Sequence, residues 1–287
     1  MPQIERPDGA RIYYEVEGSG FPLLLFAPGG VNSQVSFWKG VSAINPFEYA
    51  DEFMVIGMNQ RHAADSPAPA EAPTWEMTAA DQRAVLDAVG VQRTLLWGGC
   101  IGVGYVLRFI HDAPERVAGA VGQDPVGLVE GFNSRDTFWA MFRPAAEAAE
   151  NGGMRAVVDA AVSNPLFVRN NAAGPFAARI ATDPAFREEI AAMDPAGYVR
   201  LLHAWDDNMW GGHGAFMSVP ESFVPTCPAP LLILPGSDPF HPTATSQRIC
   251  REAPDATCLD VDCRSPEKIA ATKQTIRGFL RRCAAQG

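Results

Sequence analysis

Apolar runs of strand length alternate with helix-like stretches along most of this chain. Strands are predicted at 22–27, 53–58, 94–97, 117–121, 230–235 and 257–261, and alternating residues around Asp8-Gly9 predict a hairpin of two more. Helices are predicted at 78–89, 105–111 and 268–282. Because the strands are apolar on both faces and helices separate them, the pattern predicts an α/β fold with a buried, mostly parallel, eight-stranded sheet.

One long stretch breaks this alternation. Residues 128–223 are rich in alanine and are interrupted by helix stops such as Asn151-Gly152-Gly153, Asn164-Pro165 and Gly174-Pro175. We interpret the stretch as a helical cap inserted into a core that is formed by residues 1–127 and 224–287.

The segment from Gly98 to Gly102 carries the most specific chemical signal. It reads Gly-Gly-Cys-Ile-Gly between a predicted strand and a predicted helix. This is a nucleophile-elbow pattern in which Cys100 takes the place of the usual serine. The glycines two residues before and after Cys100 relieve crowding at a tight strand-to-helix turn. The turn aims the N–H of Ile101 and the start of the helix at the thiol, which favours a thiolate.

Composition narrows the class of partner. The chain has 287 residues, 47% of them hydrophobic, and a formal net charge of −10, which disfavours nucleic acid or an anionic membrane as a partner. The first residues show no basic and apolar leader, and no apolar run approaches the roughly 20 residues that span a bilayer. We therefore expect a cytoplasmic protein that acts on a small molecule. The oligomeric state is left open between a monomer and a homodimer.

The six cysteines follow no metal-binding spacing. There is no Cys-x-x-Cys pair and no histidine at zinc-finger distance, so we expect no metal and no cofactor. In a cytoplasmic protein free thiols are the expected state. Apart from Cys100, the cysteines are interpreted as packing or surface residues.

With these segments together, the chain resembles the α/β-hydrolase superfamily along nearly its full length. Residues 25–30, with Trp38 downstream, resemble the oxyanion loop, and residues 59–66 resemble a much-altered Asp-x-Arg-Gly-x-Gly-x-Ser loop. Residues 236–242 are similar to the loop that carries the acid of the family, which would be Asp238. The cysteine at position 100 resembles the nucleophile of dienelactone-hydrolase-like enzymes, and the resemblance to those enzymes is limited to this position.

The chain departs from the family at the general base. The family histidine follows the last strand, but this chain has no histidine beyond His241. His241 follows the carboxyl end of a core strand, where open α/β sheets bind ligands. We therefore predict that His241 activates Cys100, with Asp238 or Asp124 on its other ring nitrogen. Arg264 lies close to the vacant position and is expected to be exposed, although an inward orientation would lower the pKa of the thiol.

The resemblance implies a cysteine-dependent hydrolase of a carboxyl ester, lactone or thioester that forms an acyl-enzyme. The N–H groups of Gly30 and Ile101 would hold the oxyanion. The substrate pocket is expected to include Gly29 and, from the cap, His203, Trp205 and Trp210. Two alternatives stay open: a non-hydrolytic enzyme of the same fold, either an acyltransferase or a lyase, and a catalytically inactive member that binds a small ligand.

Overall fold

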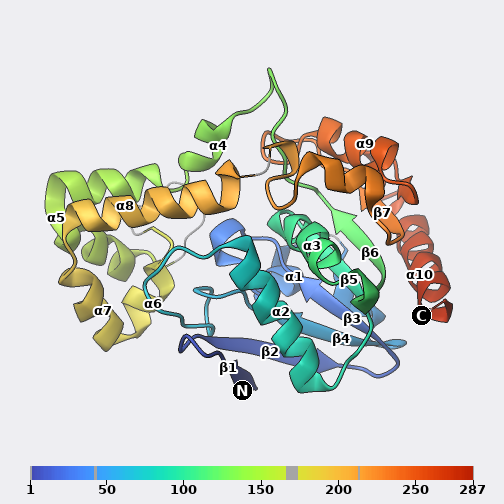
Figure 1. Ribbon diagram of the computed structural model, residues 1–287, viewed down its shortest axis with the longest axis horizontal. Helices are drawn as coiled ribbons and strands as arrows, with labels where there is room; N and C mark the ends of the chain where they lie inside the picture. Colours follow the sequence, from blue (N-terminus) through green and yellow to red (C-terminus); the bar gives the residue numbers. More distant parts are fainter. Residues whose placement is uncertain (1, 42–43, 166–173, 213, 287) are drawn as a thin grey trace.

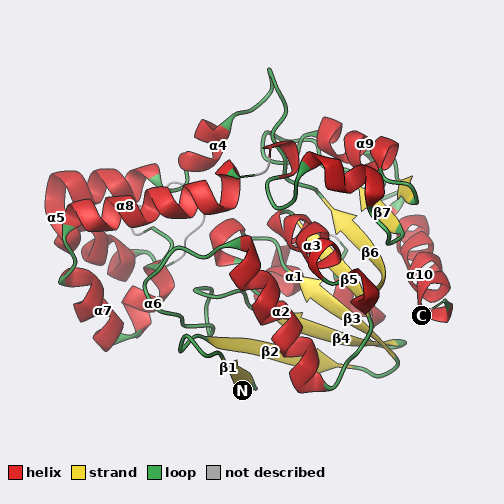
Figure 2. Cartoon of the chain, viewed as in Figure 1, coloured by secondary structure: helices red, strands yellow, loops and turns green. Residues whose placement is uncertain are grey.

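The protein folds as an eight-stranded sheet covered by helices on both faces, in a computed structural model that describes residues 2–41, 44–165, 174–212 and 214–286 (Figures 1 and 2). The sheet order is β1-β2-β4-β3-β5-β6-β7-β8. The two pairings at the β1 edge are antiparallel, and the others are parallel. The predicted fold class is confirmed. The strands are β1 Gln3–Glu5, β2 Arg11–Glu17, β3 Phe21–Phe26, β4 Phe53–Met58, β5 Thr94–Gly99, β6 Val117–Gln123, β7 Leu231–Leu234 and β8 Ala256–Cys258.

The central strands are buried on both faces, as their unbroken apolar runs require. In β3, Leu24 and Phe26 pack into the cluster on one face of the sheet, and Leu23 and Leu25 pack into the cluster on the other. Helices α2 (Trp75–Val89), α3 (Ile101–Asp112) and α9 (Thr243–Glu252) contribute to the first cluster. Helices α1 (Ser36–Val41) and α10 (Ile269–Ala285) contribute to the second.

The described chain between β6 and β7 forms no strand. Its α-helices are α4 (Arg135–Trp139), α5 (Arg143–Ser163), α6 (Ala177–Thr182), α7 (Pro184–Ala191) and α8 (Pro195–Asp206), and a π-helical turn, η4 (Asp207–Gly211), follows them. Most of these helices lie together beside the carboxyl ends of the strands (Figure 1). This is the stretch in which the sequence predicts a cap. No helix of the described chain is long and apolar enough to cross a membrane.

The cysteines differ from expectation at one pair. Cys250 of α9 and Cys258 of β8 form a disulfide, so the expectation that all six thiols are free is wrong. Packing of α9 beside β8 brings together two cysteines that lie eight residues apart, a proximity that the spacing does not reveal. Disulfides are typical of proteins from oxidising compartments. Cys227, Cys263 and Cys283 are free and buried, in agreement with a packing role.

Candidate active site

Cys100 stands at a strained turn between β5 and α3. Its φ of 57° and ψ of −122° are uncommon for a residue with a side chain. The turn is tight enough to require the flanking glycines. A Cβ built on Gly98 would lie 2.2 Å from the carbonyl oxygen of Gly102, and one on Gly102 would lie 2.1 Å from that of Phe26. The Cys100 N–H donates to the Gln123 carbonyl at 2.9 Å, which attaches the turn to the end of β6.

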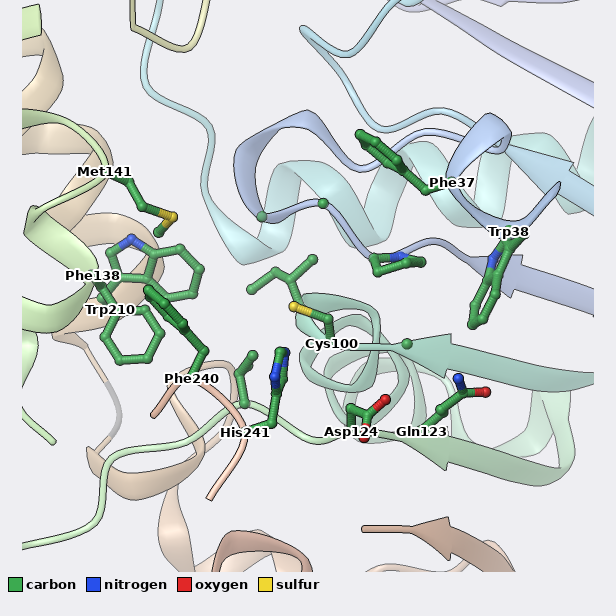
Figure 3. A pocket seen from close by; sticks show the side chains of 16 residues that line it. Phe37, Trp38, Cys100, Gln123, Asp124, Phe138, Met141, Trp210, Phe240 and His241 are labelled. Carbon is green, nitrogen blue, oxygen red and sulfur yellow. The ribbon is translucent and has the colours of Figure 1, made fainter. Parts of the chain in front are cut away.

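His241 reaches Cys100 from the loop between β7 and α9. Figure 3 shows its ring directed toward the cysteine. The Nδ1 atom lies 2.8 Å from Asp238 Oδ2, and the Asp238 carboxylate also accepts the backbone N–H groups of Phe240 and His241. The Nε2 atom is buried, and the interaction of the His241 ring with Cys100 contributes to the pKa shifts of both residues. The sequence prediction that His241 faces the cavity beside Cys100 agrees with this geometry.

The charged forms of Cys100 and His241 stabilise each other. Burial raises the pKa of the Cys100 thiol, but the His241 imidazolium and backbone hydrogen bonds from Ile101 and Gly29 outweigh burial, so the pKa lies below its usual value. Burial lowers the pKa of His241, but the Cys100 thiolate and the Asp238 carboxylate raise it to about 9. For Asp238, burial is outweighed by its hydrogen bonds and by the positive ring, so its pKa is lowered. The arrangement therefore makes Cys100 easier to ionise than a free thiol and holds His241 in its protonated form more firmly than a free imidazole.

The backbone donors beside the sulfur come from two loops. The backbone N–H groups of Ile101, at the start of α3, and Gly29, after β3, lower the pKa of the Cys100 thiol. Gly29 has a φ of 123°, and a Cβ there would lie 2.5 Å from the ring of Phe37. Gly30 lines the cavity next to Gly29. The assignment of Ile101 and Gly30 as oxyanion donors stays a prediction.

Cys100 opens into a cavity of about 430 Å³. Figure 3 shows Phe138, Met141, Trp210 and Phe240 on one side of the sulfur and Phe37 and Trp38 on the other. Among the described residues that line the cavity there is no lysine or arginine. Its size suits a small organic ligand, and its lining suits a neutral, apolar one.

Two predicted pocket residues, Gly29 and Trp210, line this cavity, but two others do not. Trp205 is buried between Phe142, Phe176 and His62 inside the helical region. His203 stacks on Trp139 at a centroid distance of 4.1 Å and does not reach the cavity. The prediction is wrong for these two residues because their side chains pack against aromatic residues of other segments, contacts that the sequence pattern does not reveal.

Asp124 and Arg264 are also placed differently from expectation. Asp124 lines the cavity, but its carboxylate pairs with Arg264, at 2.5 Å between Oδ2 and Nη1, and the Nδ1 atom of His241 is bound by Asp238. The Arg264 side chain is only 20% exposed, so the expectation of an exposed arginine is wrong. The Arg264 side chain points inward because the Asp124 carboxylate and the Pro235 carbonyl, at the end of β7, both accept hydrogen bonds from its guanidinium group.

Most of the cavity lining was not predicted from the sequence. Phe37, Phe138, Met141 and Phe240 come from three segments that meet only in the fold. Phe240 offered the one local signal, because it immediately precedes His241. Across the described residues there is no group of three or more histidine, cysteine, aspartate or glutamate side chains that could hold a metal ion.

Comparison with known proteins agrees with this architecture. The chain belongs to the α/β hydrolase fold family, whose model matches residues 22–177. A zearalenone hydrolase of Bionectria ochroleuca is 29% identical over 119 residues, which make up 41% of this chain and 44% of that protein, so the similarity reaches less than half of either.

Solved structures are similar over almost the whole chain. An esterase from Thermogutta terrifontis has a TM-score of 0.62 at 19% identity and covers 99% of this chain and 100% of its own. Est816, described as an N-acyl homoserine lactone degrading enzyme, has a TM-score of 0.58 at 21% identity and covers 97% of this chain and 100% of its own. At these identities the likeness shows the fold.

Proposed function

We propose that this protein hydrolyses a carboxyl ester or lactone of a small, neutral, apolar molecule through a thioester on Cys100. The observation that carries the proposal is the relay of Cys100, His241 and Asp238, in which Asp238 Oδ2 lies 2.8 Å from Nδ1 of a histidine whose ring is directed toward the nucleophile. The names of a relative, a zearalenone hydrolase, and of a structural neighbour, a lactone-degrading enzyme, support the same class of bond.

The proposed reaction has two halves. In the first, the Cys100 thiolate attacks the carbonyl carbon, and backbone N–H groups, with Ile101 among them, hold the oxyanion. The intermediate collapses as His241 Nε2–H gives its proton to the departing oxygen, which leaves as an alcohol or phenol. In the second, His241 takes a proton from water, the hydroxide attacks the thioester, and the acid product departs as the Cys100 thiolate returns.

The cavity supports the proposed substrate class. It is walled mainly by aromatic rings and Met141, and its polar side chains gather at the end that holds Cys100 and His241. An apolar acyl or leaving group would bury its surface against the rings, and its carbonyl would lie among the polar groups. A carboxylate on the substrate would meet no lysine or arginine among the described lining residues.

The proposal is tested with zearalenone and a series of phenyl esters, with product release followed by chromatography and Cys100 by intact-protein and peptide mass spectrometry. We expect hydrolysis and an acyl adduct on Cys100 that disappears as product forms. Cys227→Ala is the matched control, because Cys227 is a buried thiol that does not line the cavity. Binding without turnover or adduct would support the inactive ligand-binding alternative.

The same experiment separates hydrolysis from acyl transfer. The thioester on Cys100 could pass its acyl group to an alcohol, amine or thiol, and an added acceptor would then compete with water. Acylated acceptor that forms faster than the free acid would assign the protein as an acyltransferase. Cleavage of a carbon–carbon bond without an adduct on Cys100 would assign it as a lyase.

A further inference from the structure

Arg264 connects three loops at the carboxyl edge of the sheet. It lies in the loop between β8 and α10, close to the position that the resemblance assigns to the family histidine. Its Nη1 atom donates to Asp124 Oδ2 at 2.5 Å, and its Nη2 atom donates to the Pro235 carbonyl at 2.6 Å. Asp124 directly follows β6, and Pro235 directly follows β7. One side chain therefore joins the ends of β6 and β7. The end of β6 supports the turn of Cys100, and the loop of His241 begins at the end of β7.

Asp124 lies next in the chain to the residue that supports the turn of Cys100, and it borders the loop of His241. It follows Gln123, whose carbonyl accepts the Cys100 N–H at 2.9 Å. It also borders the His241 loop, because a Cβ built on Gly236 would lie 2.4 Å from His241 Cβ and 3.1 Å from Asp124 Oδ1. Asp124 is one of the residues that line the cavity.

Without a cation, this carboxylate would disturb the relay in two ways. A negative charge in the cavity that Cys100 lines disfavours the thiolate. A free carboxylate next to the histidine loop would also compete with Asp238 for the Nδ1–H group. The contact with Arg264 removes both effects, because it neutralises the charge and turns Oδ2 toward the β8–α10 loop.

We propose that Arg264 is a positioning residue that neutralises Asp124, so that Cys100 ionises readily and His241 keeps Asp238 as its only carboxylate partner. The proposal rests on the proposed use of Cys100 as a nucleophile, but it does not depend on the substrate. Among the described residues, the charged and titratable side chains that face the pair or its supports are Asp238 of the same loop, Asp124 after β6, Arg264 after β8 and Tyr105 of α3.

The test is the pH dependence of Cys100 alkylation by iodoacetamide, a neutral reagent, in Arg264→Met, Asp124→Asn and the double variant. Peptide mass spectrometry reports modification of Cys100 alone. Arg264→Met removes the cation and should raise the midpoint by roughly one pH unit, and Asp124→Asn removes the anion and should lower it by a similar amount. The double variant should return to the wild-type midpoint, because the two charges cancel.

A structural role of the pair would give a different pattern. Midpoints that stay at the wild-type value, or that move in the same direction in both single variants, would overturn the proposal. Arg264→Lys keeps the charge and should keep the midpoint even if it loses the contact with Pro235. If Arg264→Met does not fold, the direction of the shift in Asp124→Asn decides alone. A low wild-type midpoint without ester hydrolysis would refute the proposed function and leave the charge arrangement standing.

Discussion

Two histidines lie in strand-end loops of this protein and exist in opposite states. His241 follows β7, contacts Asp238 and faces Cys100, and its pKa is raised to about 9. His62 follows β4 and packs against Phe176 and Trp205, and burial, with Arg61 and Arg179 nearby, lowers its pKa to about 3. Neither ring nitrogen of His62 has a hydrogen bond of good geometry to a described residue.

The comparison teaches that the surroundings select the base. An imidazole becomes a proton carrier where an anion stabilises its charged form, and it behaves as an apolar ring where burial is not compensated. In this chain Arg264 lies close to the position that the resemblance assigns to the family histidine, and His241 comes from the preceding strand-end loop. Under the proposed function, the relay would be formed from another loop of the same sheet edge.

The largest expected effect on turnover comes from replacing Cys100, the residue that His241 faces. Cys100→Ala should lose essentially all turnover of a confirmed ester substrate, because no thioester can form. Cys100→Ser should keep little activity, since a hydroxyl needs a stronger base than a thiol does. Steady-state rates measure both, and circular dichroism checks the fold. A Cys100→Ala protein that keeps most of its activity would refute covalent catalysis.

His241→Gln should slow acylation by about 10²–10⁴-fold, the range of general acid–base catalysis. The matched variant is His62→Asn, which alters the other strand-end histidine and should leave kcat/KM close to the wild-type value. Single-turnover release of a phenol from a phenyl ester measures the acylation step. Equal losses in the two variants would break the distinction drawn between the two loops.

Asp238→Asn should have an intermediate effect. An asparagine oxygen still accepts Nδ1–H but carries no charge, so the pKa of His241 should fall from about 9 by roughly one to two units. The alkaline limb of the kcat/KM profile, where the imidazolium loses its proton, should move down by the same amount. Asp260→Asn is the control, because Asp260 is an exposed carboxylate that contacts Lys268 in the β8–α10 loop. An unmoved limb would show that Asp238 has no influence on the base.

The smallest effect concerns acid stability. Because the folded state keeps His62 neutral to about pH 3 and the unfolded chain protonates it near 6.5, stability contributed by the neutral ring is lost as the pH falls below about 6.5. His62→Asn should recover on the order of 1–2 kcal/mol of unfolding free energy at pH 5 relative to pH 8. Urea unfolding at the two pH values measures the difference. An identical pH dependence in wild type and variant would contradict the neutral, buried state.

The sequence pattern was sufficient for the sheet, the elbow and His241, because each is a local signal. Apolar runs mark β3 to β7, glycines mark the turn at Cys100, and the position of His241 after β7 places it at the ligand-binding edge. Partnerships across the fold were not accessible in the same way. The Arg264–Asp124 pair joins residues 140 positions apart, and the Cys250–Cys258 disulfide depends on how α9 packs beside β8.

In the helical region between β6 and β7, the sequence likewise did not show which aromatic side chains line the cavity. Trp205 and Trp210 lie five residues apart in the chain, yet only Trp210 lines the cavity. Trp205 lies on α8 and packs among Phe142, Phe176 and His62. Trp210 lies on the π-helical turn η4 and stacks on Phe138. The change from α-helix to π-helix between the two residues directs their side chains to different neighbours, and the sequence pattern does not predict that change.

The most direct test of the account is the midpoint of Cys100 alkylation against pH in the wild-type protein and in His241→Gln. A thiolate that is stabilised by the His241 imidazolium should give a wild-type midpoint below about 8.5, the pKa of a free thiol. Removal of the ring should move the midpoint to or above that value, because burial then acts without compensation. Equal midpoints in the two proteins would contradict the claim that His241 activates Cys100.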